Sequence, residues 1–146
     1  MLGWSIWDAC QMPASSRAIE LALAAAQAAS DKLAQDIVAL DVSGHLALSD
    51  VFVICSAAND RQVHAIVDEV EHQLLVLGEK PLHREGQRDG HWVLLDYPDI
   101  VVHVQLDETR KHYRLERLWN DCPTIALPVD TAAAVAQGSL GPGGAF

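Results

Sequence analysis

The sequence predicts an α/β fold in which a single domain combines a mixed β-sheet of about five strands with packed helices. Two observations support this class. Segments near residues 17–35 and 60–77 carry apolar residues at the spacing of a helix face, whereas short runs such as VFVI and VVHV are rich in β-branched residues. The order helix, two strands, helix, three strands, helix then predicts one mixed sheet with helices packed on it.

The first predicted helix begins at Ser15 or Ser16, either of which is a good N-cap, and runs to Gln35. Its many alanines give it a high helix propensity. Its apolar face is expected to contain Ile19, Leu23, Ala26, Ser30 and Leu33. Strands are expected next at 36–42 and 50–56, and the second, which is apolar on both faces, is typical of an inner strand.

A second helix is expected from Asn59 or Asp60 until Gly78, because Asn and Asp are good N-caps and Gly commonly ends helices. A short strand at 81–85 and a polar loop follow. The segment HWVLLDYPDIVVHVQ (91–105) then predicts a β-hairpin, with Pro98-Asp99 as a two-residue turn.

This register separates the hairpin into two faces. One face pairs Tyr97 with Ile100, Leu95 with Val102, and Val93 with Val104; it is almost purely apolar and is expected to be core. The other face pairs Asp96 with Val101, Leu94 with His103, and Trp92 with Gln105. Either a helix covers this mixed face, or Trp92 and Leu94 anchor a protein partner with Asp96 and His103 around them.

The ends of the chain differ from its middle. The last helix is expected from residue 108 or 109 to Trp119. Residues 1–14 show no period and are treated as an extension, residues 15–122 as the folded domain, and the Ala-, Gly- and Pro-rich residues 123–146 as a disordered tail.

Charge and cysteine content limit the classes of protein to which this chain can belong. Ten basic against 20 acidic residues give the 146-residue chain a formal charge of −10, so direct nucleic-acid binding is expected to be minor at most. An acidic body suits a basic protein partner. The three cysteines are widely spaced, which predicts neither a disulfide framework nor a zinc site. No apolar run approaches the length of a membrane span and no secretion signal is evident, so a cytoplasmic protein is expected.

The sequence offers no clear catalytic site. It lacks a nucleophile elbow, a P-loop and paired metal-binding histidines, so no catalytic residue, metal or cofactor is expected. Acidic residues are the strongest remaining candidates for chemistry. Asp99 is explained by the turn, but Asp41, Asp50 and Asp96 leave open a magnesium-dependent nucleotidyl- or phosphotransferase as the alternative function.

Three blocks carry a family resemblance: DIVALDVSGHLALSDVFVICSAANDRQVHAIVDEV, REGQRDGHWVLLDYPDIVVHVQ and TRKHYRLERLW. They resemble the ribosomal silencing factor family, also called Iojap-like, over about Ala18 to Cys122, whereas the first 14 residues and the tail do not. The resemblance implies a nucleotidyltransferase-like core without catalytic acids, and a protein that is not an enzyme. It also implies binding to the large ribosomal subunit through its protein number fourteen, which sterically blocks joining of the small subunit and represses translation under nutrient limitation.

The resemblance maps the partner-binding surface onto Trp92, Leu94, Asp96 and the neighbouring Tyr97. His103 belongs to the same mixed face. Tyr113 is added because it lies on the opposite side of the last helix from Leu115, Leu118 and Trp119. A homodimer that pairs through the Trp92 face remains a further alternative.

Overall fold

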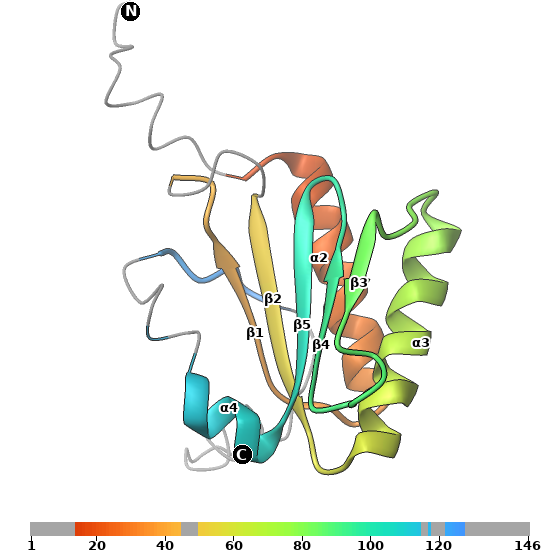
Figure 1. Ribbon diagram of the computed structural model, residues 1–146. Coiled ribbons are helices and arrows are strands. Elements are labelled where there is room, and N and C mark those ends of the chain that lie inside the picture. Colours follow the sequence, from red (N-terminus) through yellow and green to blue (C-terminus); the bar gives the residue numbers. More distant parts are fainter. Residues whose placement is uncertain (1–13, 45–49, 115–116, 118–121, 128–146) are drawn as a thin grey trace, which may run out of the picture.

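The computed structural model describes residues 14–44, 50–114, 117 and 122–127, and the expectations for residues 1–13 and 128–146 lie outside this part. The described chain folds into one mixed five-stranded sheet and three helices (Figure 1). In chain order the elements are α2 (Ser16–Asp31), β1 (Gln35–Asp41), β2 (Val51–Ala57), α3 (Asp60–Val76), β3 (His83–Glu85), β4 (Trp92–Asp96), β5 (Ile100–Leu106) and α4 (Asp107–Tyr113). The predicted fold class is confirmed.

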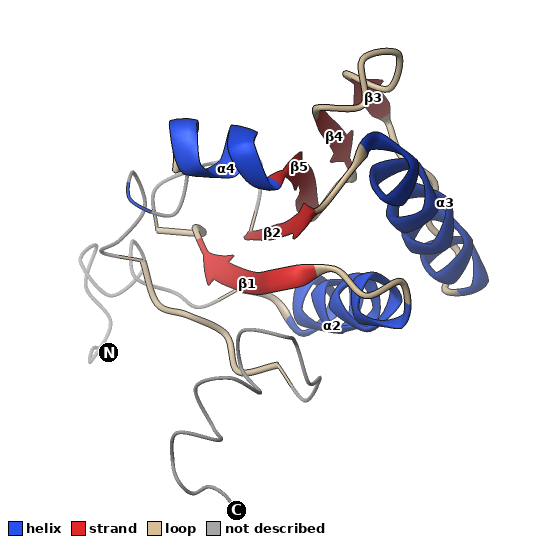
Figure 2. Ribbon diagram, turned by 90° about the horizontal axis from the view of Figure 1, so that it is seen from below, coloured by secondary structure: helices blue, strands red, loops and turns tan. Residues whose placement is uncertain are grey.

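The strands lie in the order β1-β2-β5-β4-β3. Only the central pair β2 and β5 is parallel, and the other neighbours are antiparallel. Helices α2 and α3 pack together on one face of this sheet, whereas α4 lies on the opposite face, against β5 and β2 (Figure 2). We call the face that carries α4 the outer face. Strand β2 lies between β1 and β5, so the inner position in the sheet that was predicted for residues 50–56 is confirmed.

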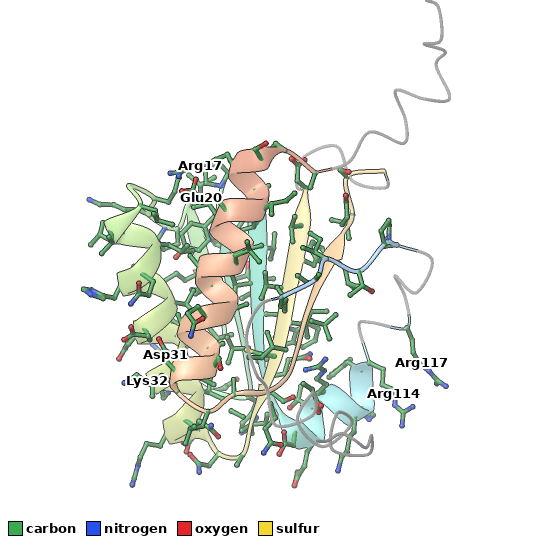
Figure 3. All side chains as sticks on the ribbon, turned by 180° about the vertical axis from the view of Figure 1, so that it is seen from behind. Arg17, Glu20, Asp31, Lys32, Arg114 and Arg117 are labelled. Carbon is green, nitrogen blue, oxygen red and sulfur yellow. The ribbon has the colours of Figure 1, made fainter. Side chains whose placement is uncertain are left out.

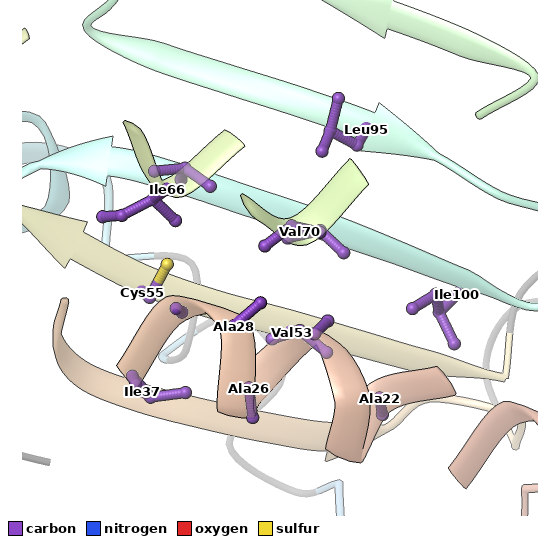
Figure 4. Packing of buried hydrophobic residues seen from close by; sticks show 14 of the residues in the cluster. Ala22, Ala26, Ala28, Ile37, Val53, Cys55, Ile66, Val70, Leu95 and Ile100 are labelled. Carbon is purple, nitrogen blue, oxygen red and sulfur yellow. The ribbon is translucent and has the colours of Figure 1, made fainter. Parts of the chain in front are cut away.

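The main core lies between the sheet and the pair α2 and α3 (Figure 4). The buried side of α2 consists mostly of alanines: Ala18, Leu21, Ala22, Ala25, Ala26, Ala28 and Ala29. The predicted face was wrong in its orientation, because Ile19 and Leu23 are only partly buried. Small side chains let this helix lie close to the sheet, so alanines rather than the larger residues mark its inner side.

Helix α2 also ends earlier than predicted, at Asp31. Leu33 adopts a left-handed backbone conformation (φ 65°), the Leu33 N–H donates to Ser30 O (2.9 Å), and the Ala34 N–H donates to Ala29 O (3.0 Å). These paired bonds form the Schellman arrangement that closes a helix. Leu33 therefore points away from the core and is 77% exposed, contrary to its predicted place on the apolar face.

The expected caps of the first two helices are present. The Ser15 hydroxyl accepts a hydrogen bond from the Ala18 N–H, and the Asn59 side chain accepts one from the Gln62 N–H. Gly78 (φ 90°) follows α3 in the left-handed conformation that its sequence position predicts. Arg17 then joins the two helices, since its guanidinium donates to Leu77 O (2.6 Å) and to the Glu79 carboxylate (3.1 Å).

The hairpin register is confirmed. Strand β4 pairs with β5 in the predicted way, from Trp92 opposite Gln105 to Asp96 opposite Val101. The Tyr97 N–H donates to Ile100 O (2.9 Å), which closes the turn at Pro98-Asp99. Alternate residues of β4 consequently lie on opposite faces of the sheet.

The last helix differs from the expectation, because α4 ends at Tyr113, where Arg114 takes a left-handed conformation (φ 48°). Arg117 is helical again, and the end predicted at Trp119 lies outside the described residues. Beyond this break the side chains of Arg114 and Arg117 point outward (Figure 3), and residues 115–116 and 118–121 lie outside the described part.

The expected disordered tail does not begin at residue 123. The Asp41 N–H donates to Pro123 O (2.8 Å), and the Ile125 N–H donates to Ala39 O (2.8 Å). Thr124 forms a bridge opposite Leu40. Residues 123–127 therefore lie along the edge strand β1, and we call this segment the C-terminal strap.

Candidate functional site

The accessible part of the outer face lies on β4. Trp92, Leu94 and Asp96 point to this face and are each partly buried, whereas Val93 and Leu95 point to the core and are fully buried. A large aromatic, an aliphatic and an acidic side chain therefore follow one another along a single strand. Such a row can bury apolar surface against another molecule while its acidic end meets a positive charge.

The neighbouring strand β5 forms the floor of this site. Its outer-face residues Val101, His103 and Gln105 are all buried. The mixed face recognised in the sequence therefore has an accessible row on β4 and a covered row on β5. The explanation that a helix covers the mixed face therefore applies to the β5 row, against which α4 packs, whereas the β4 row stays accessible.

Four rings on three strands and one helix form an aromatic cluster, which we define as Phe52, Trp92, His103 and Tyr113. The Trp92 and Tyr113 ring centroids are 5.0 Å apart, and those of Phe52 and His103 are also 5.0 Å apart. Tyr113 is 55% exposed and lies at the end of α4, so it extends the surface of Trp92 outward. The structure thus brings Tyr113 to the predicted site from a separate element.

His103 on β5 contacts the side chain of Trp92 on the neighbouring strand β4. The Trp92 indole N–H donates to His103 Nδ1 at 3.2 Å. Because this nitrogen accepts, the neutral imidazole carries its proton on Nε2, which is buried and has no hydrogen-bond partner among the described residues. Burial lowers the pKa of His103 to about 4, so the ring is neutral near pH 7.

Gln105 is the second polar residue of the floor. Its side chain is fully buried, and within the described part of the chain neither its amide nitrogen nor its amide oxygen has a hydrogen-bond partner. Nearby on β2, the Ser56 hydroxyl accepts a hydrogen bond from Arg110 (3.0 Å). The floor is therefore polar as well as closed, which distinguishes it from the apolar core on the other side of the sheet.

Arg110 was not predicted to belong to this region. Arg110 is buried and, besides Ser56, donates to Asp36 O. It fastens α4 to the ends of β1 and β2 and so places Tyr113 beside Trp92. The short sequence DETRKHY has no apolar spacing from which this inward side chain could have been recognised.

Tyr97 does not belong to the outer face, and its inclusion in the predicted partner-binding set is corrected. Strand alternation points it to the side of α2 and α3, where it is 1% exposed. Burial raises the pKa of its phenol, whose oxygen has no hydrogen-bond partner in the portion that the structure describes. A side chain in this position is not accessible to a docking protein.

The acids considered for catalysis have local structural contacts. Asp41 accepts hydrogen bonds from the Ala14 N–H (2.9 Å) and the Ser43 N–H (3.0 Å), and Asp50 accepts one from the Ser15 N–H (3.0 Å). Within the described ranges, no three His, Cys, Asp or Glu side chains are arranged to hold a metal ion. A hollow of about 790 Å³ between α3 and β3 is lined by other residues, among them Glu71 and Arg84.

Two further findings concern the cysteines and the possibility of a membrane-spanning helix. Cys55 and Cys122 are both buried in the molecule. In the part of the chain that the structure describes, no helix has the length and apolar character needed to cross a membrane.

Comparison with known proteins decides the family. The family model for the ribosomal silencing factor during starvation matches residues 15–139. The chain belongs to the ribosomal silencing factor family. This confirms the resemblance seen in the three sequence blocks, and the match continues beyond the domain boundary predicted at residue 122.

Individual relatives agree with this assignment. The chain is 43% identical to the ribosomal silencing factor of Bacillus subtilis (strain 168) over 103 residues, which cover 70% of this chain and 87% of the relative. A crystal structure of a Chromobacterium violaceum protein matches with a TM-score of 0.67 and 32% identity, covering 80% of this chain and 96% of the other. A mouse protein named mitochondrial assembly of ribosomal large subunit protein 1 is 33% identical over 89 residues, or 59% of this chain and 39% of the mouse protein.

Proposed function

We propose that this silencing factor binds the large ribosomal subunit through the ribosomal protein number fourteen of that subunit, using the outer face of β4. Once bound, it sterically blocks joining of the small subunit and represses translation in the cytoplasm when nutrients are scarce. The observation that carries the proposal is the partly exposed row of Trp92, Leu94 and Asp96, extended by Tyr113.

The chemistry of this row fits a basic protein surface. Trp and Tyr supply most of the energy in many protein interfaces because they bury a large area with few rotatable bonds. Asp96 adds a negative charge at one end of the row, and the whole chain has a net charge of −10. This charge favours encounter with a positively charged ribosomal protein and disfavours extended contact with ribosomal RNA phosphates.

The proposed action requires only occupancy and no chemical step. A protein seated where two ribosomal subunits meet prevents their contact as long as it stays bound, so its effect depends on its affinity and concentration. The transferase alternative receives no support from the geometry, because the candidate acids Asp41 and Asp50 accept backbone hydrogen bonds at the start of α2 and in the turn after β1.

A subunit-joining experiment tests this proposal. Isolated large subunits are incubated with increasing amounts of the full chain, small subunits are added, and joined ribosomes are separated on a sucrose gradient. We expect the chain to co-sediment with large but not small subunits, and the joined fraction to fall as the chain is added. Unchanged joining at full occupancy of the large subunit would contradict the blocking mechanism.

The same preparation tests the partner and the homodimer. Purified protein number fourteen of the large subunit is expected to bind the chain by itself, and a failure of this pair to associate would overturn the partner assignment. Sedimentation of the free chain over a range of concentrations shows whether it self-associates. If the Trp92 face forms a homodimer, substitution of Trp92 will weaken self-association and subunit binding together.

A further inference from the structure

We propose that His103 is a positioning residue that fixes the indole of Trp92, so that a docking partner meets the ring surface of Trp92 and not its N–H group. This inference rests on the proposed function, because it concerns how the same face is prepared for its partner. It changes the role of His103 from a predicted contact residue to a buried support beneath the contact residue.

The geometry of the pair supports this role. His103 is 5% exposed, so its imidazole offers almost no surface to another protein. Its one hydrogen bond among the described contacts is the 3.2 Å bond that Nδ1 accepts from the Trp92 indole. The indole N–H is a donor only, and this bond satisfies it within the chain. The indole therefore presents its rings to the outside.

The choice of histidine at this position needs a reason, because the position is buried. No described residue offers His103 Nε2 a hydrogen bond, and burying an unpaired polar atom is unfavourable. An aliphatic residue, like the neighbouring Val101 on the same face, would avoid this cost. What an aliphatic residue cannot supply is the acceptor that meets the Trp92 N–H.

Tyr113 completes the arrangement from the other side. Its ring lies 5.0 Å from that of Trp92 with an interplanar angle of 48°, while the imidazole lies 6.1 Å from the indole. Trp92 is thus held by the hydrogen bond that it donates to His103 on β5 and by a ring contact with Tyr113 on α4. A side chain that is already fixed loses less conformational entropy when it is buried in an interface, which strengthens binding.

A double-mutant cycle tests this role directly, with binding of the full chain to isolated large subunits as the readout. In the parent, we expect His103→Leu to weaken binding by about tenfold, since it removes the acceptor but keeps an apolar side chain of similar size. In a Trp92→Phe background the N–H is already absent, and the same change should alter binding by less than about twofold. Equal effects in both backgrounds would mean that His103 acts independently of the indole and would overturn the inference.

The conservative variant His103→Asn provides the rescue, because its side-chain oxygen can accept the same indole N–H. We expect it to bind within about threefold of the parent, a difference smaller than one hydrogen bond typically contributes. If His103→Asn binds as weakly as His103→Leu while both variants melt near the parent, the acceptor is not what matters and the inference fails.

A spectroscopic measurement keeps the inference testable even if the leucine variant does not fold. A long-range ¹H–¹⁵N spectrum of the full chain is expected to show His103 as the tautomer with a bare Nδ1 and a protonated Nε2. A protonated Nδ1 at neutral pH would overturn the inference. Trp92→Ala distinguishes this outcome from failure of the proposed function, because normal binding by that variant contradicts the docking site whatever the tautomer of His103.

Discussion

At the scale of single residues, the outer face joins an accessible tryptophan to a buried histidine. Trp92 is partly exposed, and beneath it His103 is closed off from solvent and has a pKa lowered by burial to about 4. A neutral His103 can accept the indole N–H, whereas a protonated one would bring two donors together. The geometry of Trp92 is therefore coupled to the protonation of His103.

This coupling predicts that the folded chain becomes less stable as the pH falls. His103 has an ordinary pKa of 6.5 and a folded-state pKa of about 4, so between these values the unfolded chain binds more protons than the folded one. The stabilisation is fully present above pH 6.5 and is lost as the pH falls towards 4. We expect the free energy of unfolding to fall by about 2 kcal/mol from His103 alone between roughly pH 6.5 and 5.

Urea unfolding at several pH values in this range measures the effect. The matched control is His103→Asn, which keeps an acceptor but does not titrate, and its stability should depend less steeply on pH by the same amount. Parallel pH dependence in the parent and in His103→Asn would show that His103 is not the group responsible.

Glycine positions give a second prediction at this scale. Gly86 (φ 82°) precedes β4, and a Cβ there would lie 1.9 Å from the backbone oxygen of Trp92. Gly78 (φ 90°) has the same kind of conformation but open space around it. We expect Gly78→Ala to lower the free energy of unfolding by about 1–2 kcal/mol and Gly86→Ala by more than about 3 kcal/mol. Urea unfolding of the two variants decides this, and equal losses would contradict it.

At the scale of elements, α4 reaches the site through one buried side chain. Arg110 donates to Ser56 Oγ and to Asp36 O, and three residues later Tyr113 meets Trp92. Arg110 to Met keeps most of the apolar stem but removes the guanidinium donors, leaving both acceptors without this bond. We expect this change to lower the free energy of unfolding by about 2–3 kcal/mol.

The consequence for the site can be measured separately. Nuclear Overhauser contacts between the Tyr113 and Trp92 rings should weaken in Arg110→Met, whereas Lys111→Met, on an exposed neighbour in the same helix, should leave them unchanged. If both variants keep the contacts, Arg110 does not place α4 at the site.

The elements also show where sequence reasoning succeeds. The hairpin register follows from Pro98-Asp99 and the alternation of faces, because a shift by one residue would bury Asp96 and expose Val93. The face of α2 could not be predicted in the same way, since a helix with so many alanines presents no single larger apolar stripe. The inward turn of Arg110 depends on acceptors supplied by distant strands, which no local pattern contains.

The sequence also predicted part, but not all, of the candidate site. Trp92, Leu94 and Asp96 lie together on the outer face as the alternation predicts, and Tyr113 joins them from α4. Tyr97 was assigned by its nearness in sequence to this row, although the same alternation places it in the core. The bond between Trp92 and His103 involves diagonal neighbours on adjacent strands, so their side-chain orientations were needed to see it.

At the scale of the whole molecule, the sheet has one face covered by α2 and α3 and another partly left open beside α4 (Figure 2). The edge strand β1 is covered by the C-terminal strap, whose Ile125 and Leu127 pack against the main core. An exposed strand edge invites pairing with another chain, and the strap prevents this.

Removal of the strap should therefore have two effects. We expect a chain ending at Cys122 to lose about 2–3 kcal/mol of unfolding free energy, from the exposed apolar surface, and to self-associate more strongly than the parent. A chain ending at Leu127 retains the strap and is the matched control. Thermal melting and sedimentation velocity compare the two, and a chain ending at Cys122 that remains as stable and as monomeric as the control would refute this role.

The central claim is that the outer face of β4 is the ribosome-docking surface, and the most direct measurement is the affinity of substituted chains for isolated large subunits. We predict that Trp92→Ala weakens binding by at least about 30-fold and Leu94→Ala by about 5- to 10-fold, as for interface residues that bury their side chains. Leu75→Ala, on an exposed site of α3 on the opposite side of the sheet, should bind like the parent. Parent-like binding by Trp92→Ala and Leu94→Ala, with folding unchanged, would contradict the claim.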